Sequence, residues 1–368
     1  MSETETLYAS PNLEVLRRAP HGSAIMVITF QSFFDAHEPP RGGFGEVFLD
    51  ANGLDAIHVI SRSNAWYQYA DMPAALAVIA AAAAAATTRV TYGLSMGAYA
   101  AVRFARDVQA DRVVAISPQY SIDPRTVPFE KRWAEFSPEI TFLWDWPSPT
   151  AERASTGPEV AAIYDPHNRD IRHVALIAAH HPVHHILVPH GGHPVTALLT
   201  EAGMLSGLIL NLIRGTHDPA AFDALLAERS PQTAAFHAVQ ADALPRHETR
   251  RRLALHRRAA ELAPDDRHIQ RGFAVMLGAA GRHAEALEHL QRCWNTCPTD
   301  PFTTQALANA LSRNGRHPEA VATAEAAVNL SGGRANFRAT LALMRRRQRV
   351  ANALGLIGIK RPSTPRAP

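Results

Sequence analysis

The pentapeptide Gly93-Leu94-Ser95-Met96-Gly97 decides the fold of the first part of this chain. It follows a short run rich in β-branched and apolar residues at 89–94 and precedes a helical pattern over 96–108. A serine in such a strand-to-helix turn has an unfavourable backbone conformation, and the segments on both sides of it approach closely, so the flanking positions need glycine. The pattern predicts that the turn holds the Ser95 hydroxyl above the end of a β-sheet, beside the first amides of a helix.

The sequence around this turn alternates short apolar runs with helical patterns as far as Gly215, which is typical of an α/β domain with a mostly parallel sheet. The expected strands cover residues 24–30, 56–60, 89–94, 112–117, 160–164 and 185–189, with an antiparallel edge pair at 6–9 and 13–17. The expected helices cover residues 45–52, 72–87, 96–108 and 195–213.

A serine hydroxyl is a weak nucleophile near neutral pH and needs a histidine base that an acid orients. His193 lies in PHGGHPVT, just past the last expected strand, and Asp165 in AIYDPHNRD follows the strand before it. We predict Ser95, His193 and Asp165 as the catalytic residues, because the carboxyl ends of parallel strands bring such residues together. His190 is the alternative base, and Asp170 is the alternative acid.

Two backbone amides are expected to stabilise negative charge on the substrate oxygen. The first belongs to Met96, at the start of the helix, and the second to Gln31, in the loop FQSFFD after the strand at 24–30. The segment 122–157, rich in proline and aromatic residues, is predicted to be a cap over the site; the alternative is a small core packed at the sheet edge.

The GLSMG turn, the YDP acid segment and the GGH histidine turn make the first 215 or so residues resemble the α/β-hydrolase superfamily. The resemblance implies the fold and a Ser-His-Asp triad. It implies no particular substrate, because this superfamily includes esterases, thioesterases, peptidases and lipases.

Beyond Gly215 the pattern is helical throughout, and it repeats at an offset of 34 residues. Gly281-Arg282-His283 recurs as Gly315-Arg316-His317, and Glu285-Ala286 recurs as Glu319-Ala320. Units at 267–300 and 301–334 resemble the tetratricopeptide repeat, and a unit at 233–266 fits that pattern poorly. The resemblance implies docking of a protein partner; the alternative is a stabilising or dimerising appendage.

Composition agrees with two folded units. Up to Gly215 the chain has 15 Lys and Arg against 21 Asp and Glu, and beyond it 22 against 13, which supports a boundary there. We therefore predict a catalytic domain at 1–215, a repeat domain at 216–355 and a disordered tail at 356–368. Cys293 and Cys297 are too closely spaced on a helix for a disulfide framework, and no metal or cofactor is expected.

The start MSETETLYASP is not typical of a signal peptide, and no apolar run reaches the length of a membrane span, so a cytoplasmic location is expected. Nucleic-acid binding is not favoured, because solvated helix faces account for the basic C-terminal part. The sequence predicts a hydrolase that cleaves a carboxylic ester or related acyl bond through an acyl-enzyme. The alternatives are a thioesterase or acyltransferase acting on a partner-held substrate, and a non-enzymatic repeat scaffold with a degenerate hydrolase domain.

Overall fold

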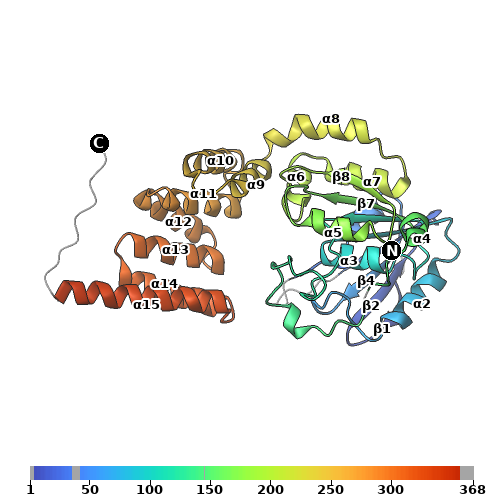
Figure 1. Ribbon diagram of the computed structural model, residues 1–368, viewed down its shortest axis with the longest axis horizontal. Helices are drawn as coiled ribbons and strands as arrows, with labels where there is room; N and C mark the ends of the chain where they lie inside the picture. The colour runs from blue at the N-terminus through green and yellow to red at the C-terminus, as the bar shows by residue number, and fades with distance from the viewer. Residues whose placement is uncertain (1–3, 35–41, 145, 357–368) are drawn as a thin grey trace. The chain divides into compact units, whose positions relative to one another are not determined.

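The computed structural model describes residues 4–34, 42–144 and 146–356. The chain divides into two compact units, Met1–Thr233 and Ala234–Pro368. Each unit has its own secondary-structure pattern (Figure 1). The predicted tail at 356–368 lies outside the described residues except for its first position.

Within the described residues of the first unit, eight strands form one sheet in the order β1-β2-β4-β3-β5-β6-β7-β8. Strands β3 to β8 run parallel to one another, whereas β1 and β2 form an antiparallel edge. The α/β fold class predicted from the sequence is confirmed. Its strands are β1 (Glu5–Ala9), β2 (Leu13–Arg18), β3 (Ile25–Phe30), β4 (Asp55–Ser61), β5 (Thr88–Leu94), β6 (Arg112–Ile116), β7 (Glu159–Tyr164) and β8 (Val183–Leu187).

The helices of the first unit connect the strands. They are α1 (Glu46–Ala51), α2 (Met72–Ala83), α3 (Met96–Arg103), α4 (Ala151–Thr156), α5 (Asp170–Ile177), α6 (Thr196–Glu201), α7 (Leu205–Arg214) and α8 (Pro219–Arg229), with short 3₁₀ turns η1 (Ser137–Glu139) and η2 (Ser230–Gln232). The single helix expected at 195–213 is two helices, because Gly203 between them has a φ of 65°.

Helix α8 belongs to the first unit, so the division of the chain falls after this helix and not at Gly215. Phe222 and Leu226 of α8 are buried, and the Arg229 guanidinium donates a 2.9 Å hydrogen bond to the Ala202 carbonyl after α6. A helical pattern in the sequence does not show which neighbour a helix packs against, and here the neighbours lie in the first unit.

The second unit is a stack of antiparallel helices in which each helix packs against the next (Figure 1). Helices α11 and α13 begin 34 positions apart, as do α12 and α14, in agreement with the sequence repeat. Its helices are α9 (Ala234–Ala243), α10 (Thr249–Leu262), α11 (Arg267–Ala279), α12 (His283–Thr296), α13 (Pro301–Arg313), α14 (His317–Leu330) and α15 (Ala335–Leu356).

Small buried residues recur at matching positions of the two clear repeats and let the helices approach closely. In the first repeat they are Ala274, Ala286 and Cys293, and in the second Ala308, Ala320 and Ala327. The turns between paired helices also match, since Gly281 has a φ of 82° and Gly315 a φ of 78°. Among the helices that the structure describes, none is long and apolar enough to cross a membrane.

Candidate active site

Ser95 lies between β5 and α3 with φ 52° and ψ −109°, a conformation that non-glycine residues rarely adopt. The crowding predicted around it is present. A Cβ atom on Gly97 would lie 2.2 Å from the Phe30 carbonyl oxygen, and one on Gly93 would lie 2.3 Å from the backbone of Gly97. Both glycines are therefore required by the close approach of α3 to the sheet.

The Ser95 hydroxyl and the His193 ring are in contact. Ser95 Oγ lies 3.0 Å from His193 Nε2, and His193 Nδ1 lies 2.8 Å from Oδ2 of Asp170. The Asp170 carboxylate is an acceptor for Nδ1–H, which leaves Nε2 to accept a proton from the serine. Serine, imidazole and carboxylate thus form one hydrogen-bonded line, with Ser95 only 5% exposed and Asp170 fully buried.

The carboxylate at the end of this line belongs to Asp170, the first residue of α5, and not to Asp165 as the sequence predicted. Asp165 follows β7, and its carboxylate accepts hydrogen bonds from the backbone N–H groups of His167 at 2.9 Å, His190 at 3.2 Å and Gly192 at 2.9 Å. Asp165 therefore holds the loop that carries His193, and the loop after β7 brings the later aspartate to the ring.

His190, the alternative base in the sequence, stacks on His167 with ring centroids 4.6 Å apart. The histidine that contacts Ser95 is His193, as predicted. Asn168 connects the two loops, because its side-chain amide donates to the Gly192 carbonyl at 2.8 Å and its oxygen accepts from the Asp170 N–H at 2.7 Å.

The Asp170 carboxylate has a second partner that the sequence analysis missed. Arg132 Nη2 donates a 2.8 Å hydrogen bond to Asp170 Oδ1. Burial by itself raises the pKa of the Asp170 carboxyl, but the hydrogen bond with His193 and the charges of His193 and Arg132 lower it below its ordinary value. No sequence signal linked Arg132 to Asp170, because the two residues lie 38 positions apart in the chain.

The backbone amides near Ser95 differ from the prediction at one position. The Gln31 N–H donates to the Val59 carbonyl at 3.1 Å, so it extends the pairing of β3 with β4 and is not available to a substrate oxygen. The N–H of Met96, at the start of α3, has no hydrogen-bond acceptor within the described part of the chain. The same holds for Ser32 and Phe33, the two residues after Gln31.

Aromatic residues of the segment 122–157 lie against the site. The ring centroid of Trp133 is 6.4 Å from that of His193, and 5.1 Å from that of Phe33 in the loop after β3. Trp133 also contacts Trp66, which is 1% exposed. Trp133 of this segment therefore packs on the core and also flanks the histidine.

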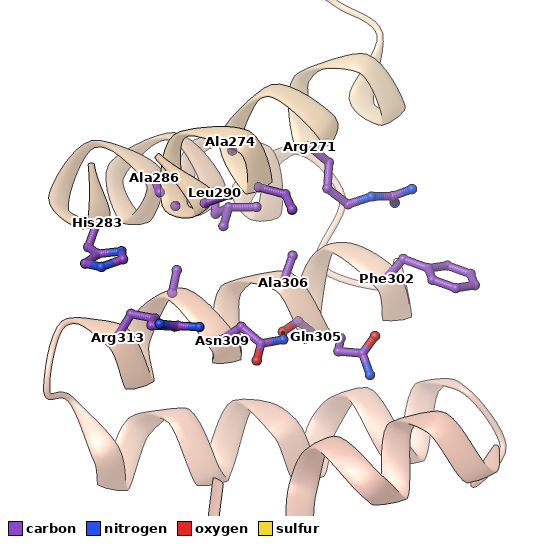
Figure 2. A pocket seen from close by; sticks show the side chains of 14 residues that line it. Arg271, Ala274, His283, Ala286, Leu290, Phe302, Gln305, Ala306, Asn309 and Arg313 are labelled. Carbon is purple, nitrogen blue, oxygen red and sulfur yellow. Dashed lines mark hydrogen bonds between the residues drawn. The ribbon is translucent and has the colours of Figure 1, made fainter. Parts of the chain in front are cut away.

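The second unit contains a cavity of about 460 Å³ between α11, α12 and α13. Figure 2 shows Arg271 and Phe302 at one end of it and His283 and Arg313 at the other, with Ala274, Ala286, Leu290 and Ala306 between them. None of the described residues that line the cavity is a carboxylate, although Arg271 is paired with Asp300 at 2.8 Å beside it. Among the described residues, no cluster of His, Cys, Asp and Glu has the composition of a metal site.

No protein-family model and no curated protein matches the chain. Solved structures do match each unit. The α/β-hydrolase enzyme MGS-M1 from a Medee basin deep-sea metagenome library is 16% identical with a TM-score of 0.36, and covers 63% of this chain and 98% of its own. An esterase from Pyrococcus furiosus is 13% identical with a TM-score of 0.39, and covers 59% and 92%.

The TPR domain of Sgt2 from Aspergillus fumigatus is 18% identical with a TM-score of 0.30, and covers 36% of this chain and 88% of its own. These are likenesses of fold. The strand order and the 34-residue spacing of the helices by themselves describe an α/β unit with a mostly parallel sheet followed by a region of helical repeats.

Proposed function

We propose that the chain is a serine hydrolase that cleaves a carboxylic ester or a related acyl bond. The observation that carries the proposal is the line of hydrogen bonds from Ser95 through His193 to Asp170, with distances of 3.0 and 2.8 Å. The serine is held in a strained turn at the start of a helix, directly before the Met96 amide.

In the proposed reaction His193 Nε2 takes the proton of Ser95 as Oγ attacks the substrate carbonyl carbon. The Met96 amide and an amide of Ser32 or Phe33 stabilise the oxyanion of the tetrahedral intermediate. The imidazolium then protonates the leaving group, and a water molecule activated by His193 releases the acyl group from Ser95. Asp170 keeps the imidazole of His193 in the tautomer that these proton transfers need.

A fluorophosphonate probe tests the nucleophile, since it phosphonylates an activated serine. The wild-type chain is expected to be labelled, whereas Ser95→Ala and His193→Gln are not. The exposed Ser155→Ala variant serves as the matched control and keeps full labelling. Absence of labelling in folded wild-type protein would contradict the proposal and favour the non-enzymatic scaffold.

A second candidate keeps the same chemistry but delivers the acyl substrate on a partner bound to the repeats. It is favoured by the cavity between α11, α12 and α13, where Arg271, His283 and Arg313 lie among apolar residues and the described lining contains no carboxylate. The Arg313 guanidinium has no hydrogen bond or ion pair within the described part of the chain. Charge complementarity suggests an acidic peptide segment with apolar side chains as the occupant.

Fluorescence anisotropy with a fluorescein-labelled peptide of alternating Glu and Leu residues tests this second candidate. Binding to the full chain is expected to weaken at least tenfold in Arg313→Glu. Arg258→Glu in α10, which is outside the cavity, is the control and should bind as the wild type does. Equal binding by both variants would place the peptide elsewhere and reject the cavity as its site.

A further inference from the structure

The buried carboxylate of Asp170 is held from both sides. Its Oδ2 contacts His193 Nδ1 and its Oδ1 accepts a 2.8 Å hydrogen bond from Arg132 Nη2. The two contacts together fix the plane of the carboxylate and direct one oxygen to the imidazole. Arg132 belongs to the segment 122–157, whereas Asp170 begins α5, so the insertion contributes directly to the surroundings of the proposed acid.

Arg132 is in turn fixed by Glu130. The guanidinium donates through Nε to both Glu130 oxygens, at 3.1 and 3.0 Å, and the Arg132 backbone N–H donates to Oε1 at 2.7 Å. Glu130 is 4% exposed and has a further contact of 3.0 Å with His173 Nε2. Burial raises the pKa of the Glu130 carboxyl, but His173 and Arg132 outweigh this and lower it well below its ordinary value.

His173 is neutral in this network. Its Nδ1 accepts a 3.1 Å hydrogen bond from the Tyr120 N–H, so Nε2 carries the proton that it donates to Glu130. Burial lowers the pKa of His173, in spite of the opposing effect of Glu130. The order of charges leading to His193 is therefore negative at Glu130, positive at Arg132 and negative at Asp170.

We infer that Arg132 is a positioning residue of the proposed hydrolase: held by Glu130, it orients the Asp170 carboxylate toward His193 and offsets part of its negative charge. The inference rests on the proposed function. An ionised carboxylate that is fully buried is costly without a compensating charge, and Arg132 supplies that charge from the side opposite the imidazole.

A merely structural role for Arg132, as an anchor of the segment 122–157, makes a different prediction. The charged and titratable groups facing the His193–Asp170 pair are Arg132, Glu130 and His173, together with Asp165, His167 and His190 of the adjoining loops. Removing the Arg132 charge leaves two carboxylates that favour the imidazolium of His193. Removing the Glu130 charge leaves Arg132 without its counterion, which disfavours the imidazolium. The two substitutions should act in opposite directions.

The test compares full-length Arg132→Met and Glu130→Gln by the pH profile of kcat/KM for p-nitrophenyl acetate. The midpoint of the acid limb is expected to move up by about one pH unit in Arg132→Met and down by about half a unit or more in Glu130→Gln. In Arg132→Met, kcat is expected to fall about 10- to 100-fold. Arg132→Lys keeps the charge and should retain the wild-type midpoint within about 0.3 unit.

Arg125→Met is the matched control, because it breaks the ion pair with Asp123 in the same segment without touching Asp170. It should leave the midpoint unchanged. If Arg132→Met and Glu130→Gln lower the melting temperature but shift the midpoint in the same direction or not at all, Arg132 is only an anchor and the inference is wrong.

A titration of His193 does not depend on enzymatic activity. It can therefore show that this inference fails even if the proposed function holds, and the reverse. In the Ser95→Ala background, the ¹³Cε1 resonance of His193, assigned by its loss in His193→Gln, is followed by NMR against pH. The same opposite displacements are expected from Arg132→Met and Glu130→Gln. If the wild-type chain hydrolyses no ester, the hydrolase proposal fails, while this titration still decides what Arg132 does to the Asp170–His193 pair.

Discussion

His193 Nδ1 lies 2.8 Å from Asp170 Oδ2, and the loop that carries His193 is held by a different aspartate, Asp165, through the backbone N–H groups of His190 and Gly192. Two buried carboxylates thus act on one histidine loop by different means. One contacts the ring and the other fixes the backbone. This separation makes their expected mutational effects different.

Substitution of the two aspartates should separate catalysis from stability. In Asp170→Asn the imidazole loses the acceptor that selects its tautomer, and kcat/KM for p-nitrophenyl acetate is expected to fall by roughly 10³- to 10⁴-fold. In Asp165→Asn one backbone N–H acceptor becomes a donor, so the free energy of unfolding should fall by about 2–3 kcal/mol with a smaller loss of rate. A larger rate loss in Asp165→Asn than in Asp170→Asn would contradict the assignment of the acid.

Substitution by alanine should have opposite effects on the free energy of unfolding at two glycines. A Cβ on Gly97 would meet the Phe30 carbonyl oxygen at 2.2 Å, so Gly97→Ala is expected to lower the free energy of unfolding by about 2–4 kcal/mol. Gly207 lies in α7 with no atom within 4 Å of an added Cβ, so Gly207→Ala should raise it by about 0.5–1 kcal/mol. Urea unfolding of both variants measures the two effects, and a stabilised Gly97→Ala would rule out the close approach of α3 to β3.

Two buried histidines should make the first unit less stable in mild acid. Burial lowers the pKa of His58 and of His181 from 6.5 to about 4, with smaller contributions from Arg18 and Arg106 respectively. The unfolded chain therefore binds protons between pH 6.5 and 4 that the folded chain does not. Stability from these groups is present above pH 6.5 and is lost as the pH falls toward 4.

Between pH 6.5 and 5 each of these histidines should account for about 1.5 kcal/mol of lost stability. Urea unfolding at the two pH values measures this loss. His58→Gln is expected to be less stable at pH 6.5 but to lose less on acidification than the wild type. The exposed His247→Gln variant should follow the wild-type pH dependence. An unchanged dependence in His58→Gln would show that the ring takes up its proton in the folded state as readily as in the unfolded one.

The two equivalent helix caps of the repeats should differ in strength. Asp266 accepts from the N–H groups of His268 and Ile269, and Asp300 accepts from those of Phe302 and Thr303. Asp300 also pairs with Arg271 at 2.8 Å. Alanine at position 266 is expected to cost about 1 kcal/mol and at position 300 about 2 kcal/mol, measured on the unfolding transition of the second unit. Equal losses would indicate that the ion pair contributes nothing.

The sequence alone indicated the fold of both units because their signals are local. Strands of β-branched residues, the crowded turn at Ser95 and the 34-residue spacing of small residues each depend on neighbours along the chain or on a fixed period. His193 could also be predicted from the sequence, because a glycine-rich turn after the last strand is a local feature. Periodicity did not reveal that α8 packs with the first unit, since it gives the apolar face of a helix and not its partner.

The tertiary structure decided the partners of these local features. Asp165 and Asp170 are both buried and follow the same strand, and only the path of the loop after β7 shows which of them reaches His193. In the same way the pairing of β3 with β4 continues through Gln31 and occupies the amide that the sequence assigned to the substrate oxygen. Arg132 meets Asp170 across 38 positions of chain, a distance at which no local pattern constrains which side chains touch.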